Sequence, residues 1–306
     1  MRVHWFVMIE ARVETECVTM KVIMVPVSNR PESKTALLTS FDLAARLDAN
    51  IVAYHLRPHR SMDMEYKPIG LPLFGSANHR WLDELDTKSS KSAAHQAKKT
   101  FTQVAHESGF KITHGAGTIA GGSAQWHEKV GSPDRLMEIL GPVADLSVIS
   151  RPAASSHVGR IFLLAALMHS GRPLLVLPPK MKKAPGKRVT IAWNQSPEVC
   201  RIVSSCMSMI RAADEVNIVA CGRQDRLGPK AAQLKSYLKN WGVKANVLTT
   251  KGRNEEAELM QAYRETKSDL MMMGAYSRAR LREVVFGGMT EYMLWHARIP
   301  IVIQHD

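Results

Sequence analysis

Cysteines are scarce in this sequence, with four among 306 residues. Cys200 and Cys206 lie six positions apart on an expected helix, so their side chains point to different faces, and Cys17 and Cys221 are isolated. This spacing predicts neither a disulfide framework nor a zinc site. Long hydrophobic runs are also lacking, since no apolar stretch approaches the roughly 20 residues that cross a bilayer. We therefore expect a cytoplasmic protein with no membrane segment.

A small-residue cleavage site is missing behind the apolar stretch "VHWFVMI", because Glu10, Glu14 and Glu16 follow it. This pattern is not that of a signal peptide. We interpret residues 1–19 as a leader of uncertain order, with Met20 as an alternative natural start, because the first clear strand begins there.

Acidic residues are outnumbered, with 28 Asp and Glu against 41 Lys and Arg, which gives a formal net charge of +13. Such a charge raises the question of a nucleic-acid partner. The basic residues are scattered, however, with modest clusters only at 180–188 and 278–282. We expect no nucleic-acid partner, and the excess of positive charge has no specific explanation in the sequence.

The chain contains an internal repeat, in which short apolar segments recur in the same order. Each copy begins with an apolar strand that runs into a polar turn ending in Pro-Glu, and a helical stretch follows. The matching segments are 21–32 with 187–198, 50–56 with 217–223, 144–150 with 268–274, and 171–178 with 297–304. We infer two copies of one domain, at 20–179 and 188–306, joined by an exposed linker at 180–187 that is rich in Pro, Gly and Lys.

Strands and helices alternate within each copy. The strands are short, β-branched and apolar at nearly every position, which is typical of strands covered by helices on both faces. The helices carry apolar stripes, such as Leu234, Leu238 and Trp241 on one side. The sequence therefore predicts an α/β fold with two tandem copies of a five-stranded parallel sheet. Ligands of such folds bind beyond the carboxyl ends of the strands.

The stretch "GAYSRARLREVVFGGM" (274–289) follows the fourth strand of the second copy. Together with the closing "HARIPIVI", it resembles the universal stress protein family. The resemblance covers both copies and implies a Rossmann-like domain related to the adenine nucleotide alpha hydrolases. Many members bind ATP through a motif of Gly, two residues, Gly, nine residues, Gly, then Ser or Thr.

The match to this motif is partial. Gly274 and Gly287 match the first and third glycines, whereas Ser277 replaces the second glycine and Gly288 replaces the Ser or Thr. Ser277 adds a Cβ, which disfavours a positive φ, and Gly288 still offers a backbone N–H to phosphate. Arg278, Arg280 and Arg282 are either phosphate partners or solvated surface charges.

The family also has an aspartate that recognises adenine and ribose after the first strand. Its counterparts here are Asn194 in the second copy and Ser28 in the first, and both types are equally typical of ordinary turns. The first copy keeps Gly159 but no spaced glycine set, so we expect it to bind no nucleotide. The nucleotide-binding candidates are Ala192, Trp193, Asn194, Val219, Met273, Gly274, Ser277, Arg278, Gly287, Gly288 and Met289, with ATP and Mg²⁺ as the implied ligands.

Catalytic patterns are missing from the sequence. Pro58 separates His55 from His59, and His296 precedes the last strand, where packing is its expected role. We predict no catalytic residue and no metal site.

The leading hypothesis is a non-catalytic, cytoplasmic stress-response protein that binds unknown protein partners and an adenine nucleotide weakly. Its copies would pair within the chain through their fifth strands, and a homodimer stays open. The alternatives are an ATP-binding switch with slow hydrolysis and, from another class, a nucleotidyl-transferring enzyme or electron-transfer flavoprotein.

Overall fold

The computed structural model describes residues 19–57, 87–115, 117, 122–153, 156–181, 183–222, 227–250, 252, 254–275 and 288–305. Its strands are β1 (Val22–Pro26), β2 (Asn50–Arg57), β3 (Lys111–Thr113), β4 (Ser123–Val130), β5 (Leu146–Ser150), β6 (Leu174–Leu177), β7 (Arg188–Ala192), β8 (Glu215–Ala220), β9 (Ala245–Thr249), β10 (Leu270–Gly274) and β11 (Ile301–Gln304).

The helices in the described residues connect most of these strands, except β3 with β4 and β6 with β7. They are α1 (Pro31–Leu47), α3 (Thr87–Glu107), α4 (Pro133–Leu140), α5 (His157–His169), α6 (Pro197–Ser205), α7 (Met207–Arg211), α8 (Ala231–Asn240), α9 (Glu255–Glu265) and α10 (Gly288–Trp295), with a short 3₁₀ helix at Gly141–Val143. None of them is both long and apolar enough to cross a membrane.

In the described part of the chain, the strands form an 11-stranded sheet in the order β3-β4-β2-β1-β5-β6-β11-β10-β7-β8-β9. The first half of the chain contributes β1 to β6 and the second half β7 to β11. Five parallel strands of each half follow the same order, which is β4-β2-β1-β5-β6 in the first and β9-β8-β7-β10-β11 in the second. This arrangement confirms the predicted α/β fold class, and the first half has one strand more than the five that the sequence predicted, since β3 pairs with β4 at its edge.

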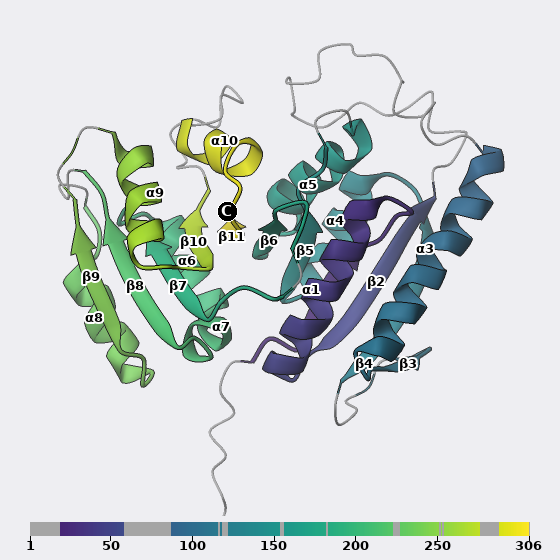
Figure 1. Ribbon diagram of the computed structural model, residues 1–306, viewed down its shortest axis with the longest axis horizontal. Coiled ribbons are helices and arrows are strands. Elements are labelled where there is room, and N and C mark those ends of the chain that lie inside the picture. Colours follow the sequence, from purple (N-terminus) through teal and green to yellow (C-terminus); the bar gives the residue numbers. More distant parts are fainter. Residues whose placement is uncertain are drawn as a thin grey trace, which may run out of the picture.

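The two halves meet at β6 and β11, which pair in antiparallel fashion. Ile301 lies opposite Val176, and Ile303 lies opposite Leu174. Among the described strand pairs, this is the only antiparallel one, and it makes the sheet continuous across the molecule (Figure 1). Such pairing also covers two strand edges that would otherwise expose unpaired backbone groups.

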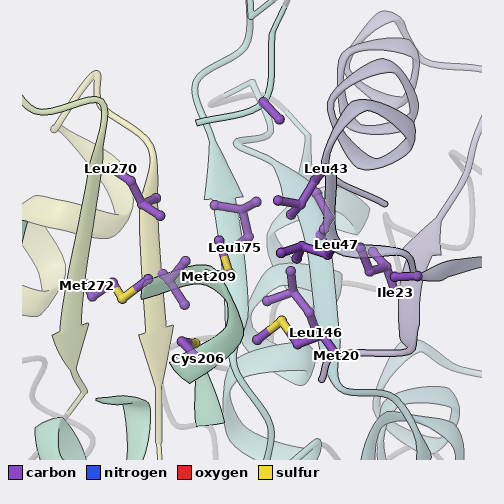
Figure 2. Packing of buried hydrophobic residues seen from close by; sticks show 14 of the residues in the cluster. Met20, Ile23, Leu43, Leu47, Leu146, Leu175, Cys206, Met209, Leu270 and Met272 are labelled. Carbon is purple, nitrogen blue, oxygen red and sulfur yellow. The ribbon is translucent and has the colours of Figure 1, made fainter. Parts of the chain in front are cut away.

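Helices cover both faces of this sheet. Helices α1, α3, α6, α7 and α8 pack on one face, and α4, α5, α9 and α10 pack on the other. Each face has a core to which both halves contribute. Figure 2 shows part of the first core, where Leu175 of the first half lies near Met209 of the second. The halves therefore share their hydrophobic interior.

The segment that joins the halves is less exposed than the sequence predicted. Ala184, Pro185 and Gly186 are buried. The backbone N–H of Ala184 donates to Asp42 at 2.7 Å, and the N–H of Gly186 donates to Asp269 at 3.0 Å. The prediction of an exposed linker was wrong for these residues because carboxylates from both halves accept hydrogen bonds from the backbone of this segment.

Candidate functional site

The carboxyl ends of β7 and β10 lie next to each other, because these strands pair in parallel. At the end of β7, the carbonyl of Val219 accepts a hydrogen bond from the backbone N–H of Trp193 at 2.8 Å. The exposed Asn194 then starts a turn in which its Oδ1 accepts the N–H of Ser196 at 3.1 Å. Ser196 in turn caps α6, since its Oγ accepts the N–H of Val199 at 3.3 Å. Asn194 is therefore a turn residue at the edge where ligands of this fold bind.

Gly274 ends β10 beneath the first turn of α6. A Cβ built on Gly274 would lie 2.7 Å from the Cβ of Glu198 and 2.7 Å from the backbone nitrogen of Val199. Real Cβ atoms do not approach backbone this closely, so α6 rests directly on the Gly274 backbone. Packing of α6 alone therefore accounts for a glycine at this position.

Gly288 is the first residue of α10 and is exposed. A Cβ on Gly288 would lie 3.2 Å from Oε1 of Glu256. The N–H groups at the start of α10 are suited to an anion, but a carboxylate already lies beside them. Ser277, Arg278 and Gly287, with Arg280 and Arg282, lie outside the described residues.

The apolar candidates fall into two groups on opposite faces of the sheet. Ala192, Val219, Met273 and Met289 belong to the core beneath α9 and α10. Trp193 belongs to the core beneath α6 and α8, where its indole N–H donates to the carbonyl of Pro229 at 2.9 Å. Its side chain therefore lies apart from the other candidates. Val219 and Met273 are 1% and 5% exposed, so a base would contact the more accessible Ala192 and Met289 first.

The sequence reasoning missed the acidic first turn of α9. Glu255, Glu256 and Glu258 occupy this turn, and Asn254 caps it by accepting the N–H of Ala257 at 3.0 Å. The side chain of Glu255 also lies close to Gly222, just beyond β8. These carboxylates repel phosphate at the same edge of the sheet. The Asn followed by Glu residues is a helix-start pattern that the sequence shows. That this helix start lies beside α10 could not be read from the sequence.

A second missed group lies where α6 meets the end of β11. Glu198 is 3% exposed, and its Oε1 lies 3.6 Å from Nη2 of Arg201. His305 is also buried, and burial lowers its pKa below the ordinary 6.5, while Glu198 raises it and Arg201 lowers it further. This group adds a charge pair, of which Glu198 is buried and Arg201 partly exposed, to the helix that rests on Gly274.

The equivalent edge of the first half, beyond the carboxyl ends of its strands, is occupied by side chains of that half. The hydroxyl of Ser28 lies 3.0 Å from that of Ser33, and Nη1 of Arg30 donates to Oγ of Ser156. A Cβ on Gly159 would lie 2.6 Å from the Cβ of Pro152, so this glycine also serves packing.

The histidines are dispersed in the structure. His55 is buried on β2, where its Nδ1 lies 2.8 Å from the carbonyl of Val27, whereas His59 lies outside the described residues. His296 is exposed, so the expected packing role was wrong; its ring stacks on that of Tyr292 at the surface. Within the described residues, no group of three or more His, Cys, Asp or Glu side chains is placed to hold a metal ion.

Comparison with known proteins identifies relatives of this fold. Residues 211–305 match the model of the universal stress protein family. The structure is similar to that of a universal stress protein from Archaeoglobus fulgidus, with a TM-score of 0.66, 12% identity, and coverage of 94% of this chain and 97% of the other. No curated protein matches the chain.

Two further similar structures come from Pseudomonas aeruginosa. One is described as a putative universal stress protein, with a TM-score of 0.53 and 10% identity, and the other as a protein of unknown function, with a TM-score of 0.52 and 11% identity. Each alignment covers 94% of this chain and 93% of the other. At such identities these structures establish the fold alone.

Proposed function

Because the second half of this chain carries a universal stress protein domain, we propose that the protein is a non-catalytic stress-response protein of the cytoplasm. In this proposal it acts by binding protein partners, and it binds an adenine nucleotide weakly through the second half. The first half serves as a structural partner that pairs with the second and binds no nucleotide.

The observation that carries the nucleotide part is the convergence of Asn194 and Gly274 at neighbouring strand ends. Parallel α/β folds bind their ligands at this edge. The amide of Asn194 can donate to and accept from a base or ribose, and the N-terminus of α10 at Gly288 supplies backbone donors for phosphate.

Weak affinity follows from the surroundings of these donors. Glu256 lies beside Gly288, and a polyphosphate there would meet like charge. Among the described residues, the backbone N–H groups at the start of α10 suit a triphosphate, whereas the carboxylate of Glu256 does not. A Mg²⁺ ion that accompanies ATP would reduce this repulsion, so we expect ATP to bind better with Mg²⁺ than without it.

Isothermal titration of the full chain with ATP and Mg²⁺ tests this part of the proposal. We expect a Kd between about 10 μM and 1 mM. Asn194→Ala should weaken binding, whereas Asn240→Ala should not, because Asn240 is the exposed last residue of α8 at the other edge of the sheet. Gly274 is unsuited to this test, since any side chain there would disturb α6.

The absence of heat at millimolar ATP would remove nucleotide binding from the proposal. Phosphate release measured in the same samples separates a binding protein from a hydrolysing switch. We expect no release above the background of free ATP, and steady release abolished by Asn194→Ala would favour the switch instead.

A further inference from the structure

A cavity of about 250 Å³ lies between α6 and α8 in the second half. It is on the face of the sheet opposite to the core that holds Ala192, Val219 and Met273. Its lining comes from the end of β7, both helices and the loop before α8: Trp193, Cys200, Val203, Pro229, Gln233, Leu234 and Tyr237.

The equivalent pair of helices in the first half is packed with aromatic rings. Between α1 and α3, the ring of Phe41 lies 6.1 Å from that of Phe101 and 4.9 Å from that of Phe110. The ring of Phe101 lies 5.4 Å from that of Trp126. The corresponding layer of the second half has Trp193 against a much shorter helix α8, and a cavity remains. The cavity is open to solvent on one side, where Gln233 and Tyr237 of its lining are exposed, so a small molecule can reach it.

The lining of the cavity restricts what it can hold. None of its side chains carries a full charge, and aromatic or aliphatic groups form most of its wall. The indole N–H of Trp193 is bonded to Pro229, and Oε1 of Gln233 accepts the N–H of Lys230 at 2.7 Å. The thiol of Cys200, the phenol of Tyr237 and the amide nitrogen of Gln233 remain as polar groups; Cys200 is partly exposed and Tyr237 is exposed. A charged ligand would lose its hydration here without gaining a partner.

We propose that this cavity binds a small, uncharged aromatic molecule between Trp193 and Tyr237. Its volume lies just below the usual range of ligand pockets, and planar rings suit a wall made of one indole and one phenol. The site is separate from the proposed nucleotide site, because it opens on the other face of the sheet. Failure of either proposal therefore leaves the other unaffected.

Protection of a thiol tests the proposal in the unmodified protein. The full chain is alkylated with iodoacetamide, with or without 2-naphthol, and labelling of each cysteine is followed by peptide mass spectrometry. At a concentration about ten times its Kd, 2-naphthol should slow the alkylation of Cys200 about tenfold. Cys221 is the internal control, since it packs against the core on the opposite face and its rate should not change.

Calorimetry with a pair of variants tests the same site without the thiol. Cys200→Trp places a large ring in the cavity and should abolish the binding of 2-naphthol. Ser204→Trp places the same ring one turn later on α6 at an exposed position outside the lining, and it should bind 2-naphthol as the unmodified protein does. Naphthalene-2-sulfonate should bind more weakly than 2-naphthol.

Three results would overturn the proposal. These are unchanged alkylation of Cys200 at about 1 mM 2-naphthol together with no heat of binding, equal protection of Cys200 and Cys221, and equal or tighter binding of the sulfonate. The alkylation experiment decides the matter even if Cys200→Trp fails to fold.

Discussion

At the scale of single residues, Gly274 shows that a motif glycine can have two explanations. Family resemblance connects it with phosphate, whereas the geometry connects it with α6, because a Cβ would lie 2.7 Å from Val199 N. That contact is with backbone, which cannot move away as a flexible side chain would.

We predict that Gly274→Ala destabilises the protein by about 1–3 kcal/mol, through overpacking against the first turn of α6. The free energy of unfolding is measured in urea. Gly115→Ala is the control, since nothing lies within 4 Å of its Cβ position, and it should change stability by less than about 0.5 kcal/mol. Equal stability of both variants would show that α6 does not rest on Gly274.

His305 gives a second prediction at this scale. Burial lowers its pKa below 6.5, so the unfolded chain binds a proton at higher pH than the folded one. Its contribution to stability is therefore complete above about pH 6.5 and is lost as the pH falls below that value. Between about pH 7.5 and pH 5.5, His305→Asn should reduce the pH dependence of the unfolding free energy. An equal effect of the same substitution at the exposed His106 would contradict the prediction.

The sequence could predict part of this site. It placed Asn194 and Gly274 at neighbouring strand ends, because strand order and direction determine that edge. It did not predict the carboxylate of Glu256 beside Gly288, since the two belong to different helices and no local pattern brings them together. The period of two along β7 predicts that Trp193 lies on the same face as Ile191 and opposite to Ala192. Trp193 and Ala192 were placed in one candidate site because of the family resemblance alone.

At the scale of elements, α10 connects the two halves. The guanidinium of Arg151, just after β5, donates from Nε to the carbonyl of Leu294 at 2.6 Å and from Nη2 to that of Met293 at 2.9 Å. The guanidinium of Arg160 on α5 lies 4.3 Å from the ring centre of Trp295. Figure 1 shows α5 and α10 above the junction of β6 and β11. Two cations of the first half thus hold the C-terminal end of α10, where the helix dipole favours positive charge.

Arg151→Met should destabilise the protein by about 2–4 kcal/mol, because hydrogen bonds from a charged group to two carbonyls are lost. Burial of the guanidinium lowers its pKa to about 10 and costs free energy in the folded state. This cost offsets part of the stabilisation by the two hydrogen bonds and limits the loss of stability on substitution. Urea unfolding measures the difference.

Arg172→Met is the matched control, since Arg172 is exposed and donates to the carbonyl of Pro142 at 3.0 Å. It should cost less than about 1 kcal/mol. A similar loss of stability for both variants would contradict the prediction that the hydrogen bonds from Arg151 to α10 stabilise the protein more than an exposed contact does.

Element types were predictable where apolar period and turn residues agreed, as in α8 with Leu234 and Leu238 buried. Two features were not. The first half has both β3 and β4 where the sequence predicted a single third strand, and the burial of Ala184 depends on Asp42, which is distant in sequence. Long-range contacts of this kind leave no local pattern.

At the scale of the whole molecule, the continuous sheet and the shared cores predict that the two halves unfold together. Leu175 of β6 and Val302 of β11 belong to one core, and Arg46 donates to the carbonyl of Pro185 at 2.5 Å. Calorimetry should therefore give one transition with equal calorimetric and van't Hoff enthalpies. Two separated transitions would show that each half is stable without the other.

The antiparallel pairing of β6 with β11 also determines which way each half faces. Because the strands of one half run against those of the other, their carboxyl ends lie along opposite margins of the joint sheet. Arg151, at such an end in the first half, accordingly meets the C-terminal end of α10 in the second. Asn194 therefore lies on the margin where the strands of its own half end and those of the first half begin.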